Sequence, residues 1–141
     1  MQYTRKVHYY ETDQMGIVHH SNYIRWFEEA RLQLLEDYDF SYSRLEELGV
    51  MSAVIGVNAE YKSMVRFGET VNIKITSLEY TGILFKLGYT VTDAADGTLR
   101  CKGTTTHCFI NSEGRPVRLK RSFPEVHALF FRLHEENKEC E

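Results

Sequence analysis

The spacing of apolar residues changes once along this chain, and that change limits the folds the chain can adopt. From Tyr23 to Tyr38, apolar side chains recur every three or four residues, which predicts a long helix with one buried face. After Gly49 the apolar residues alternate with polar ones, which predicts strands. The alternating stretches are residues 50–61, 71–76, 85–91 and 98–110. We therefore expect an α+β fold, in which one long helix packs on an antiparallel sheet of about five strands.

The segment before the long helix is expected to contain one more strand and a loop. Residues 3–10 are rich in Tyr, Thr and Val, and we expect them to form the first strand. Residues 11–22 form a loop, and Ser21 or Asn22 at its end is the expected N-cap of the long helix. The loop therefore runs directly into a buried helix.

Glycines and a proline set the expected ends of the remaining elements. A short helix is expected at Ser41–Leu48, ended by Gly49, and Gly56 marks a bulge or bend in its strand. A capping box at Ser122–Glu125, with a proline inside it, is expected to open a last helix that runs to about Leu133. The joints between the later strands are short, which predicts antiparallel hairpins and a meander. These joints are residues 80–82, 96–97 and 111–114.

Length and composition fit one globular domain spanning residues 1–141. The net charge of −3 argues against a general nucleic-acid binder. No apolar run approaches the ~20 residues that a membrane span needs, and no secretory signal is expected at the N-terminus. The three cysteines, Cys101, Cys108 and Cys140, contain no Cys-x-x-Cys pair, so neither a disulfide framework nor a zinc site is expected. A reducing, cytoplasmic location follows as the default.

One helix can cover only one face of such a sheet. A bare second face would be an apolar patch larger than monomers usually expose. We therefore expect a second copy of the chain to cover that face, giving a homo-oligomer.

The loop and the start of the long helix carry the residues that point to chemistry. Asp13 lies in this loop, close to the expected helix N-terminus. Unpaired N–H groups and the helix dipole at that end suit an oxygen that gains negative charge. A carboxylate nearby can act as a nucleophile or as a general base on water, which together allow acyl transfer to water. From spacing alone, Asp13 is equally explained as a turn residue, and His19 and His20 as capping or surface residues.

The order of these residues resembles a known family signature. The run Tyr-x-x-Thr-Asp13-x-x-Gly16-x-Val18-x-His20-x-x-Tyr23 resembles that of the 4-hydroxybenzoyl-CoA thioesterase family of hotdog-fold acyl-CoA thioesterases, especially its YbgC-like branch. Residues 60–69 resemble the second recurring block of the same family. The resemblance covers nearly the whole chain.

The resemblance implies a hotdog fold, in which an antiparallel sheet wraps around the long central helix, and a homodimer or homotetramer. It implies that Asp13 is the catalytic carboxylate and that the backbone N–H of His20 polarises the thioester carbonyl of an acyl-CoA substrate. Gly16, Val18 and Tyr23 are then substrate-binding positions. No metal and no cofactor are required by this chemistry.

Several basic and apolar residues are further candidates. Coenzyme A carries phosphates, so Arg66 and the late basic run of Arg115, Arg118, Lys120 and Arg121 are candidates to bind it, although any one of them is also explained as solvated surface. The candidates for an acyl pocket, most of them equally explained as core, are Met15, Phe27, Met51, Tyr61 and Met64.

Three alternatives stay open at this point. One is a hotdog-fold hydratase or dehydratase that pairs Asp13 with His19 or His20. Another is a thioesterase acting on acyl carrier protein. The third is a protein that binds thioesters without turnover.

Overall fold

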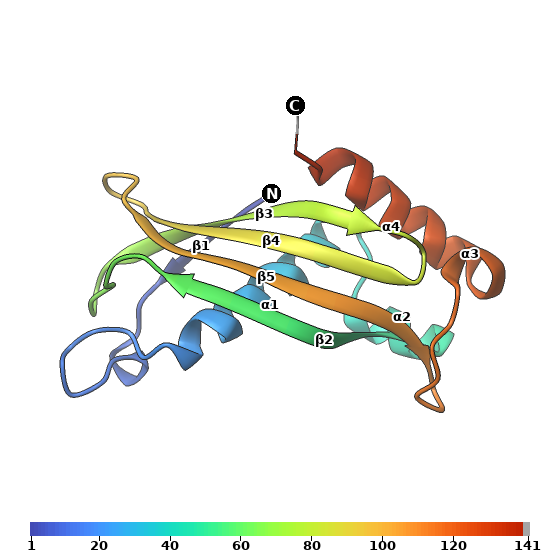
Figure 1. Ribbon diagram of the computed structural model, residues 1–141, viewed down its shortest axis with the longest axis horizontal. Helices are drawn as coiled ribbons and strands as arrows, with labels where there is room; N and C mark the ends of the chain where they lie inside the picture. The colour runs from blue at the N-terminus through green and yellow to red at the C-terminus, as the bar shows by residue number, and fades with distance from the viewer. Residues whose placement is uncertain (140–141) are drawn as a thin grey trace.

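The computed structural model describes residues 1–139 of the chain and is built from one sheet and its covering helices (Figure 1). The strands are β1 (Gln2–Lys6), β2 (Val50–Tyr61), β3 (Thr70–Tyr80), β4 (Leu84–Asp93) and β5 (Leu99–Asn111). The helices are the short 3-10 turn η1 (Tyr9–Glu11), α1 (Ser21–Asp37), α2 (Tyr42–Leu48), α3 (Leu119–Ser122) and α4 (Pro124–Asn137). The five strands lie in the order β1-β3-β4-β5-β2, and each neighbouring pair is antiparallel. The predicted α+β fold and its β3-β4-β5 meander are confirmed.

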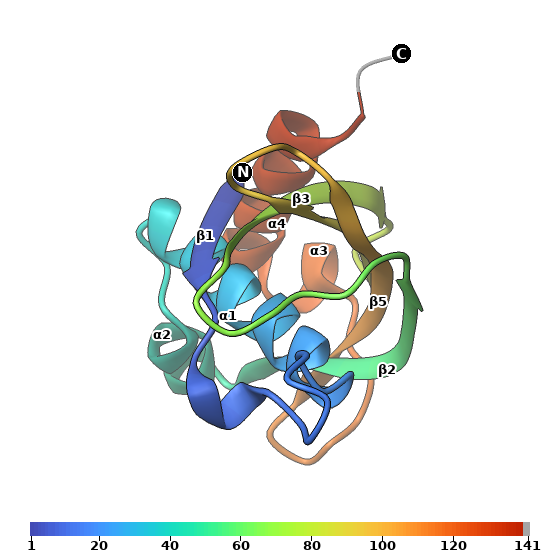
Figure 2. The ribbon, with the colours of Figure 1, turned by 90° about the vertical axis from the view of Figure 1, so that its left-hand side faces the viewer.

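Helix α1 lies against the concave face of the sheet, which curves around it (Figure 2). Phe27 and Trp26 are fully buried in this layer, and the Phe27 ring stacks on Tyr89 with a centroid distance of 4.2 Å. Gly103 makes this approach possible, because a Cβ there would lie 2.6 Å from the Phe27 ring. The apolar face of the helix is narrower than its composition suggests, since Ile24 remains 41% exposed.

The first strand is shorter than predicted. β1 ends at Lys6, and η1 turns the chain before the loop that carries Asp13. The turn brings the Glu11 carboxylate back to the His8 N–H, at 2.8 Å. The strand-forming composition of residues 3–10 therefore predicted only the first half of this segment correctly, because the contact between Glu11 and His8 overrides the local preference for a strand.

One predicted helix end and one strand bulge are confirmed, and two predicted helix caps are wrong. Gly49 ends α2 in the left-handed conformation at φ 82°, and β2 carries its bulge at Gly56, as predicted. Ser122 does not cap the last helix, because it is the last residue of α3, and Phe123 precedes α4 without a side-chain cap. At the start of α1 the N-cap residue is His20 rather than Ser21 or Asn22.

The outer face of the sheet corrects the sequence argument for an oligomer. The outward positions of β3, β4 and β5 are mainly threonines and lysines, so this face is polar rather than a bare apolar patch. They include Lys74, Thr76, Lys86, Thr90, Thr92, Lys102, Thr104 and Thr106. A row of exposed apolar side chains lies instead along the edge strand β2, at Val54, Ile55 and Val57. An apolar sheet face therefore gives no support to association, whereas the β2 edge does.

Helices α3 and α4 close one end of the sheet (Figure 1). Phe130 of α4 packs against Phe85 and Phe109, with ring centroids 5.2 and 4.9 Å apart. Among residues 1–139, no helix is long and apolar enough to cross a membrane. Cys140 and Glu141 lie outside the described residues, so the single domain over residues 1–141 stays a prediction.

Candidate active site

A short backbone hairpin holds Asp13 at the tip of its loop. Thr12 and Val18 form an isolated antiparallel bridge, and the Asp13 N–H donates to the Ile17 carbonyl at 2.9 Å. One carboxylate oxygen of Asp13, Oδ1, accepts from the Met15 N–H at 2.8 Å, and Gly16 completes the turn at φ 76°. Within residues 1–139, the second oxygen, Oδ2, has no hydrogen-bond donor. The loop therefore orients the carboxylate through one oxygen and leaves the other free.

The N-terminus of α1 follows this loop and presents a free backbone donor. The Asn22 and Tyr23 N–H groups donate to the His19 and His20 carbonyls, and the Ser21 N–H donates to the ring Nδ1 of His19 at 3.3 Å. In the described part of the chain, the N–H of His20 itself has no acceptor. The helix dipole adds partial positive charge at this end. A carbonyl oxygen placed here meets an unused donor in a favourable field.

Tyr61, at the end of β2, fixes His20 from the other side. Its hydroxyl donates to the His20 carbonyl at 3.2 Å, and its ring meets the His20 ring edge-on at 6.2 Å. Tyr23 also packs edge-on against Tyr61, at 5.1 Å. Burial raises the pKa of Tyr23 to about 12, so both it and Tyr61, whose pKa burial also raises, are neutral at physiological pH.

These parts line one open pocket of about 550 Å³. Its walls come from the Asp13 loop, the start of α1, and the segment that follows β2. The lining residues are Asp13, Ile17, Val18, His20, Tyr23, Tyr61, Lys62, Ser63 and Met64. Because a carboxylate with a free oxygen and an unused backbone donor share this pocket, it is equipped to hydrolyse an activated carbonyl.

The structure brings together most of the residues predicted from the first block. Asp13, Val18, His20 and Tyr23 line the pocket, and so do two of the suggested acyl-pocket residues, Tyr61 and Met64. Gly16 shapes the Asp13 loop without lining the pocket. Arg66 pairs through its backbone with Ile17, and its side chain is exposed beside the pocket rather than in its wall.

The late basic run does not join this pocket within one chain. Arg118, Lys120 and Arg121 lie at α3, at the opposite end of the molecule from the Asp13 loop (Figure 1). All three side chains are exposed.

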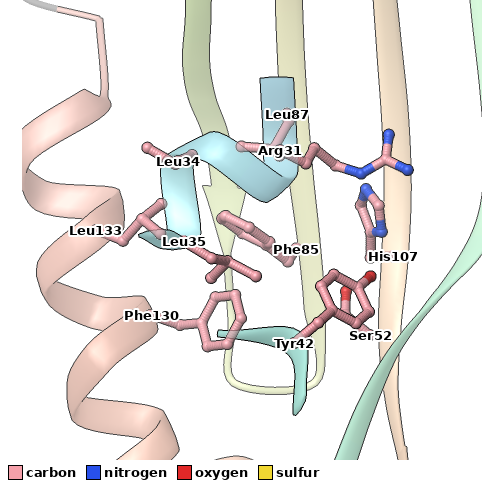
Figure 3. Close-up of a pocket in the computed structure, with 10 residues that line it drawn as sticks. All are labelled: Arg31, Leu34, Leu35, Tyr42, Ser52, Phe85, Leu87, His107, Phe130 and Leu133. Atoms are coloured by element: carbon pink, nitrogen blue, oxygen red, sulfur yellow. The ribbon is translucent and has the colours of Figure 1, made fainter. Parts of the chain in front are cut away.

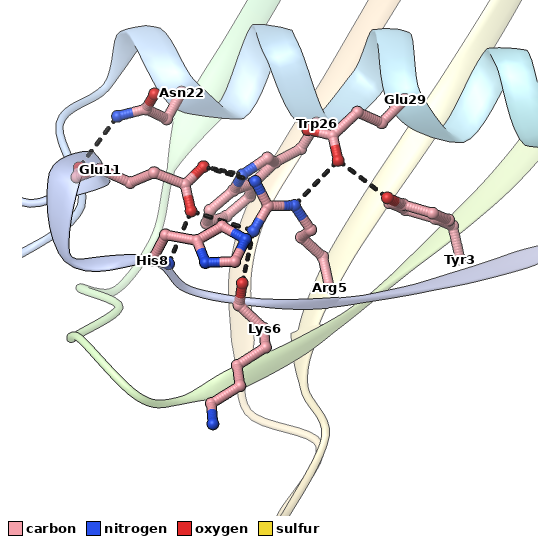
Figure 4. A network of polar contacts seen from close by, with 8 residues as sticks. All are labelled: Tyr3, Arg5, Lys6, His8, Glu11, Asn22, Trp26 and Glu29. Atoms are coloured by element: carbon pink, nitrogen blue, oxygen red, sulfur yellow. Dashed lines mark hydrogen bonds and ion pairs between the residues drawn. The ribbon is translucent and has the colours of Figure 1, made fainter.

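Glu11 is the main residue of the site region that the sequence did not reveal (Figure 4). Its carboxylate is 2% exposed and accepts from two guanidinium nitrogens of Arg5, at 3.0 and 3.1 Å. It also accepts from the Trp26 indole N–H at 2.7 Å, while the Glu11 carbonyl accepts from the Asn22 side chain at 2.9 Å. Glu29 holds the other side of the Arg5 guanidinium at 2.8 Å. This Glu11 network ties β1, the start of the Asp13 loop and α1 into one unit.

In residues 1–139, no three His, Cys, Asp or Glu side chains come together as ligands for a metal ion. Comparisons with known proteins place the chain in a family. A model of the thioesterase-like superfamily matches residues 7–131. The curated "Putative acyl-CoA thioesterase YneP" of Bacillus subtilis is 37% identical over 126 residues, which are 89% of this chain and 91% of that protein. "Acyl-CoA thioester hydrolase YbgC" of Escherichia coli is 32% identical over 82 residues, 57% of this chain and 61% of that protein.

Solved structures show the same likeness. The DHNA-CoA thioesterase from Staphylococcus aureus is similar at a TM-score of 0.88 and 32% identity, over 99% of this chain and 96% of that one. The superfamily match over residues 7–131 includes the loop that carries Asp13 and the start of α1.

Proposed function

The chain belongs to the thioesterase-like superfamily and is an acyl-CoA thioester hydrolase, and from that premise we propose that Asp13 and the N-terminus of α1 carry out the hydrolysis. The single observation that supports this assignment is the shared pocket. Asp13, with one free carboxylate oxygen, and His20, with an unused N–H, line the same cavity.

The proposed first step is attack on the thioester carbonyl. The carbonyl oxygen accepts from the His20 N–H, and the helix dipole stabilises the negative charge that this oxygen gains. Asp13 either attacks the carbonyl carbon itself or removes a proton from the attacking water. In both routes the carbon–sulfur bond breaks and the coenzyme A thiolate leaves. Asp13 as nucleophile then gives a mixed anhydride, which water cleaves to the free acid.

Asp13→Asn tests the assignment directly. The substitution removes the charge and keeps the size, so we expect kcat for thiol release to fall by ~100-fold or more, the range for loss of a general base. Asp37→Asn is the matched control, because Asp37 is exposed at the far end of the same helix, and it should leave kcat unchanged. Full activity in folded Asp13→Asn contradicts the proposal.

A single turnover in heavy-oxygen water separates the two routes. If Asp13 is the nucleophile and water attacks its carboxyl carbon, the label enters Asp13 and the first product molecule is unlabelled. If Asp13 is the general base, the label enters the product acid. Mass spectrometry of the protein and of the product acid detects the label in either place. The same thiol assay with acyl carrier protein thioesters tests the carrier protein alternative.

We further propose that the coenzyme A phosphates are bound by a second copy of the chain. Arg118, Lys120 and Arg121 lie too far along the molecule to reach the pocket of their own chain, and the exposed apolar edge of β2 supports a homo-oligomer. A cytoplasmic location stays a prediction. Because exposed charges are screened by salt, KM for acyl-CoA should rise with ionic strength. A KM that stays flat from low to high salt, or a monomer in sedimentation at micromolar concentration, contradicts this step.

A further inference from the structure

A second, smaller pocket lies beneath the sheet, away from Asp13 (Figure 3). It has a volume of about 20 Å³, which is room for one water-sized group. Its walls are mostly leucine and phenylalanine side chains from α1, β4 and α4. Four polar side chains also line it, namely Arg31, Tyr42, Ser52 and His107. Polar groups in an apolar pocket are costly unless they are bonded, so their partners decide what the pocket is for.

The His107 ring has one satisfied nitrogen and one that lacks a partner. Nε2 lies 2.8 Å from Thr105 Oγ1, whereas the buried Nδ1 has no hydrogen-bond partner in the described chain. Burial, with the Arg31 charge nearby, lowers the pKa of His107 to about 4, so the ring is neutral at physiological pH. One nitrogen therefore carries a hydrogen and the other does not.

A chain of hydrogen bonds identifies which nitrogen carries it. Arg31 Nη1 donates to the Tyr89 hydroxyl at 3.2 Å, and that hydroxyl lies 2.7 Å from Thr105 Oγ1. If the Tyr89 hydroxyl donates to Thr105 Oγ1 and the Thr105 hydroxyl donates to His107 Nε2, both hydroxyl hydrogens are in hydrogen bonds. The opposite direction leaves the phenolic hydrogen of the buried Tyr89 unpaired, which is costly. His107 therefore presents an unused Nδ1–H donor to the pocket.

Arg31 contributes a positive charge without an anionic partner. Among residues 1–139, no carboxylate lies within salt-bridge distance of its guanidinium, and its single hydrogen bond goes to neutral Tyr89. Figure 3 shows the guanidinium beside the His107 ring, with Tyr42 and Ser52 on the ring's other side. The Arg31 side chain is half-buried, so a water molecule would satisfy the donor here, whereas an anionic oxygen would also balance the charge. The His107 Nδ1–H and the Arg31 guanidinium together fit such an oxygen.

The inner face of β2 runs from this pocket, which Ser52 lines, to the Asp13 pocket, which Tyr61 lines. Val54 and Val57 pair with His107 and Thr105, so their side chains point to the same inner face. They nevertheless remain 46% and 44% exposed, because α1 does not cover this edge of the sheet. From His20 to Arg31 the rise along α1 is about 16 Å. Val54 and Val57 thus form an apolar strip, which an extended acyl group held at His20 can follow to Arg31.

We propose that the Arg31–His107 pocket receives one oxygen at the far end of the acyl group and selects substrates in which this oxygen is anionic, as in a carboxylate. This inference rests on the proposed function for the reacting end of the substrate. The apolar strip holds the middle of the acyl group, and Arg31 and the His107 Nδ1–H bind its far oxygen.

Matched thioesters test the selectivity. For a series of chain lengths, kcat/KM is measured by thiol release for each acyl-CoA and for its counterpart with a terminal carboxylate. We expect the carboxylate form to be preferred by ~10-fold or more at the length that reaches Arg31, as for a charge-assisted hydrogen bond. In Arg31→Met this preference should fall at least ~10-fold. Arg25→Met, an exposed arginine of the same helix, should keep both the preference and the rate.

A binding experiment separates this inference from the proposed mechanism. Calorimetry compares a dicarboxylic acid with the monocarboxylic acid of equal length, on the intact enzyme and on Arg31→Met, and needs no turnover. Tighter binding of the dicarboxylic acid that is lost in Arg31→Met supports the pocket even if Asp13→Asn stays active. Equal binding of the two acids at every length, or a preference that survives Arg31→Met, overturns the inference and leaves the pocket to a bound water.

Discussion

Two polar clusters lie against helix α1, and they differ in whether their hydrogen bonds are complete. In the Glu11 network, near the N-terminal half of the helix, the carboxylate accepts from Arg5, Trp26 and the backbone of the loop. In the Arg31–His107 pocket, near the C-terminal half, a cation and an imidazole donor have unused capacity. A complete network fixes structure, whereas an incomplete one has capacity left for a ligand. The same helix thus anchors the catalytic loop at one end and can receive substrate at the other.

The largest expected effect is on the completed cluster. Glu11→Gln removes a buried charge and leaves Arg5 without its bidentate partner, so we expect the free energy of unfolding to fall by about 3–5 kcal/mol, as when a buried ion pair is broken. Urea denaturation measures this change. Glu29→Gln is the control, because the Glu29 side chain is 33% exposed and its loss should cost about 1 kcal/mol or less. Equal losses in the two variants would mean that the Glu11 network does not hold the loop more firmly than a surface pair.

The sequence predicted the parts of the site that lie close together along the chain. Asp13 and His20 share one loop and helix start, so their order alone indicated their proximity. The Glu11 network depends on Arg5 and Trp26 meeting across a turn that strand propensity obscured. The Arg31–His107 pocket combines side chains from α1, α2, β2 and β5, which only the folded sheet brings together.

The fold shows the same division between local and long-range information. The alternation of apolar and polar residues predicted the bounds of β2 and β5 closely, because this alternation depends only on residues that are close together in the chain. The polar outer face was wrongly expected to be apolar, although Lys74, Thr76, Lys102 and Thr104 are visible in the strands. The number of helices that cover a sheet does not determine which residues of its strands point outward. The basic run at α3 was expected to meet the start of α1 around one coenzyme A near a subunit boundary, and within one chain the topology places it at the other end of the molecule.

The next expected effect is a pH dependence from the open cluster. The pKa of His107 is lowered from 6.5 to about 4, first by burial and then by the Arg31 charge. The unfolded chain therefore binds the proton more readily between these values. The stability that the neutral ring contributes is complete above pH 6.5 and is lost as pH falls toward 4, by about 3 kcal/mol in total.

Urea denaturation at neutral pH and near pH 4 measures this loss. His107→Gln keeps a hydrogen-bonding side chain and does not titrate, so its loss between the two pH values should be smaller than that of the native protein by roughly this amount. An identical pH dependence in both proteins would show that the ring is not held neutral by the pocket.

The smallest expected effect is that of Arg31→Met, and it is compared with the matching substitution of the arginine in the Glu11 network. Arg5→Met leaves the buried Glu11 carboxylate unpaired and should cost about 3–5 kcal/mol of unfolding free energy. Arg31→Met loses a single hydrogen bond to Tyr89 and removes a cation that has no counter-charge, so we expect a loss of about 1 kcal/mol or less. Both substitutions keep a long apolar stem, and urea denaturation under one set of conditions compares them. A loss in Arg31→Met as large as that in Arg5→Met would mean that Arg31 supports the fold, and would remove the reason for regarding its charge as free to bind a substrate.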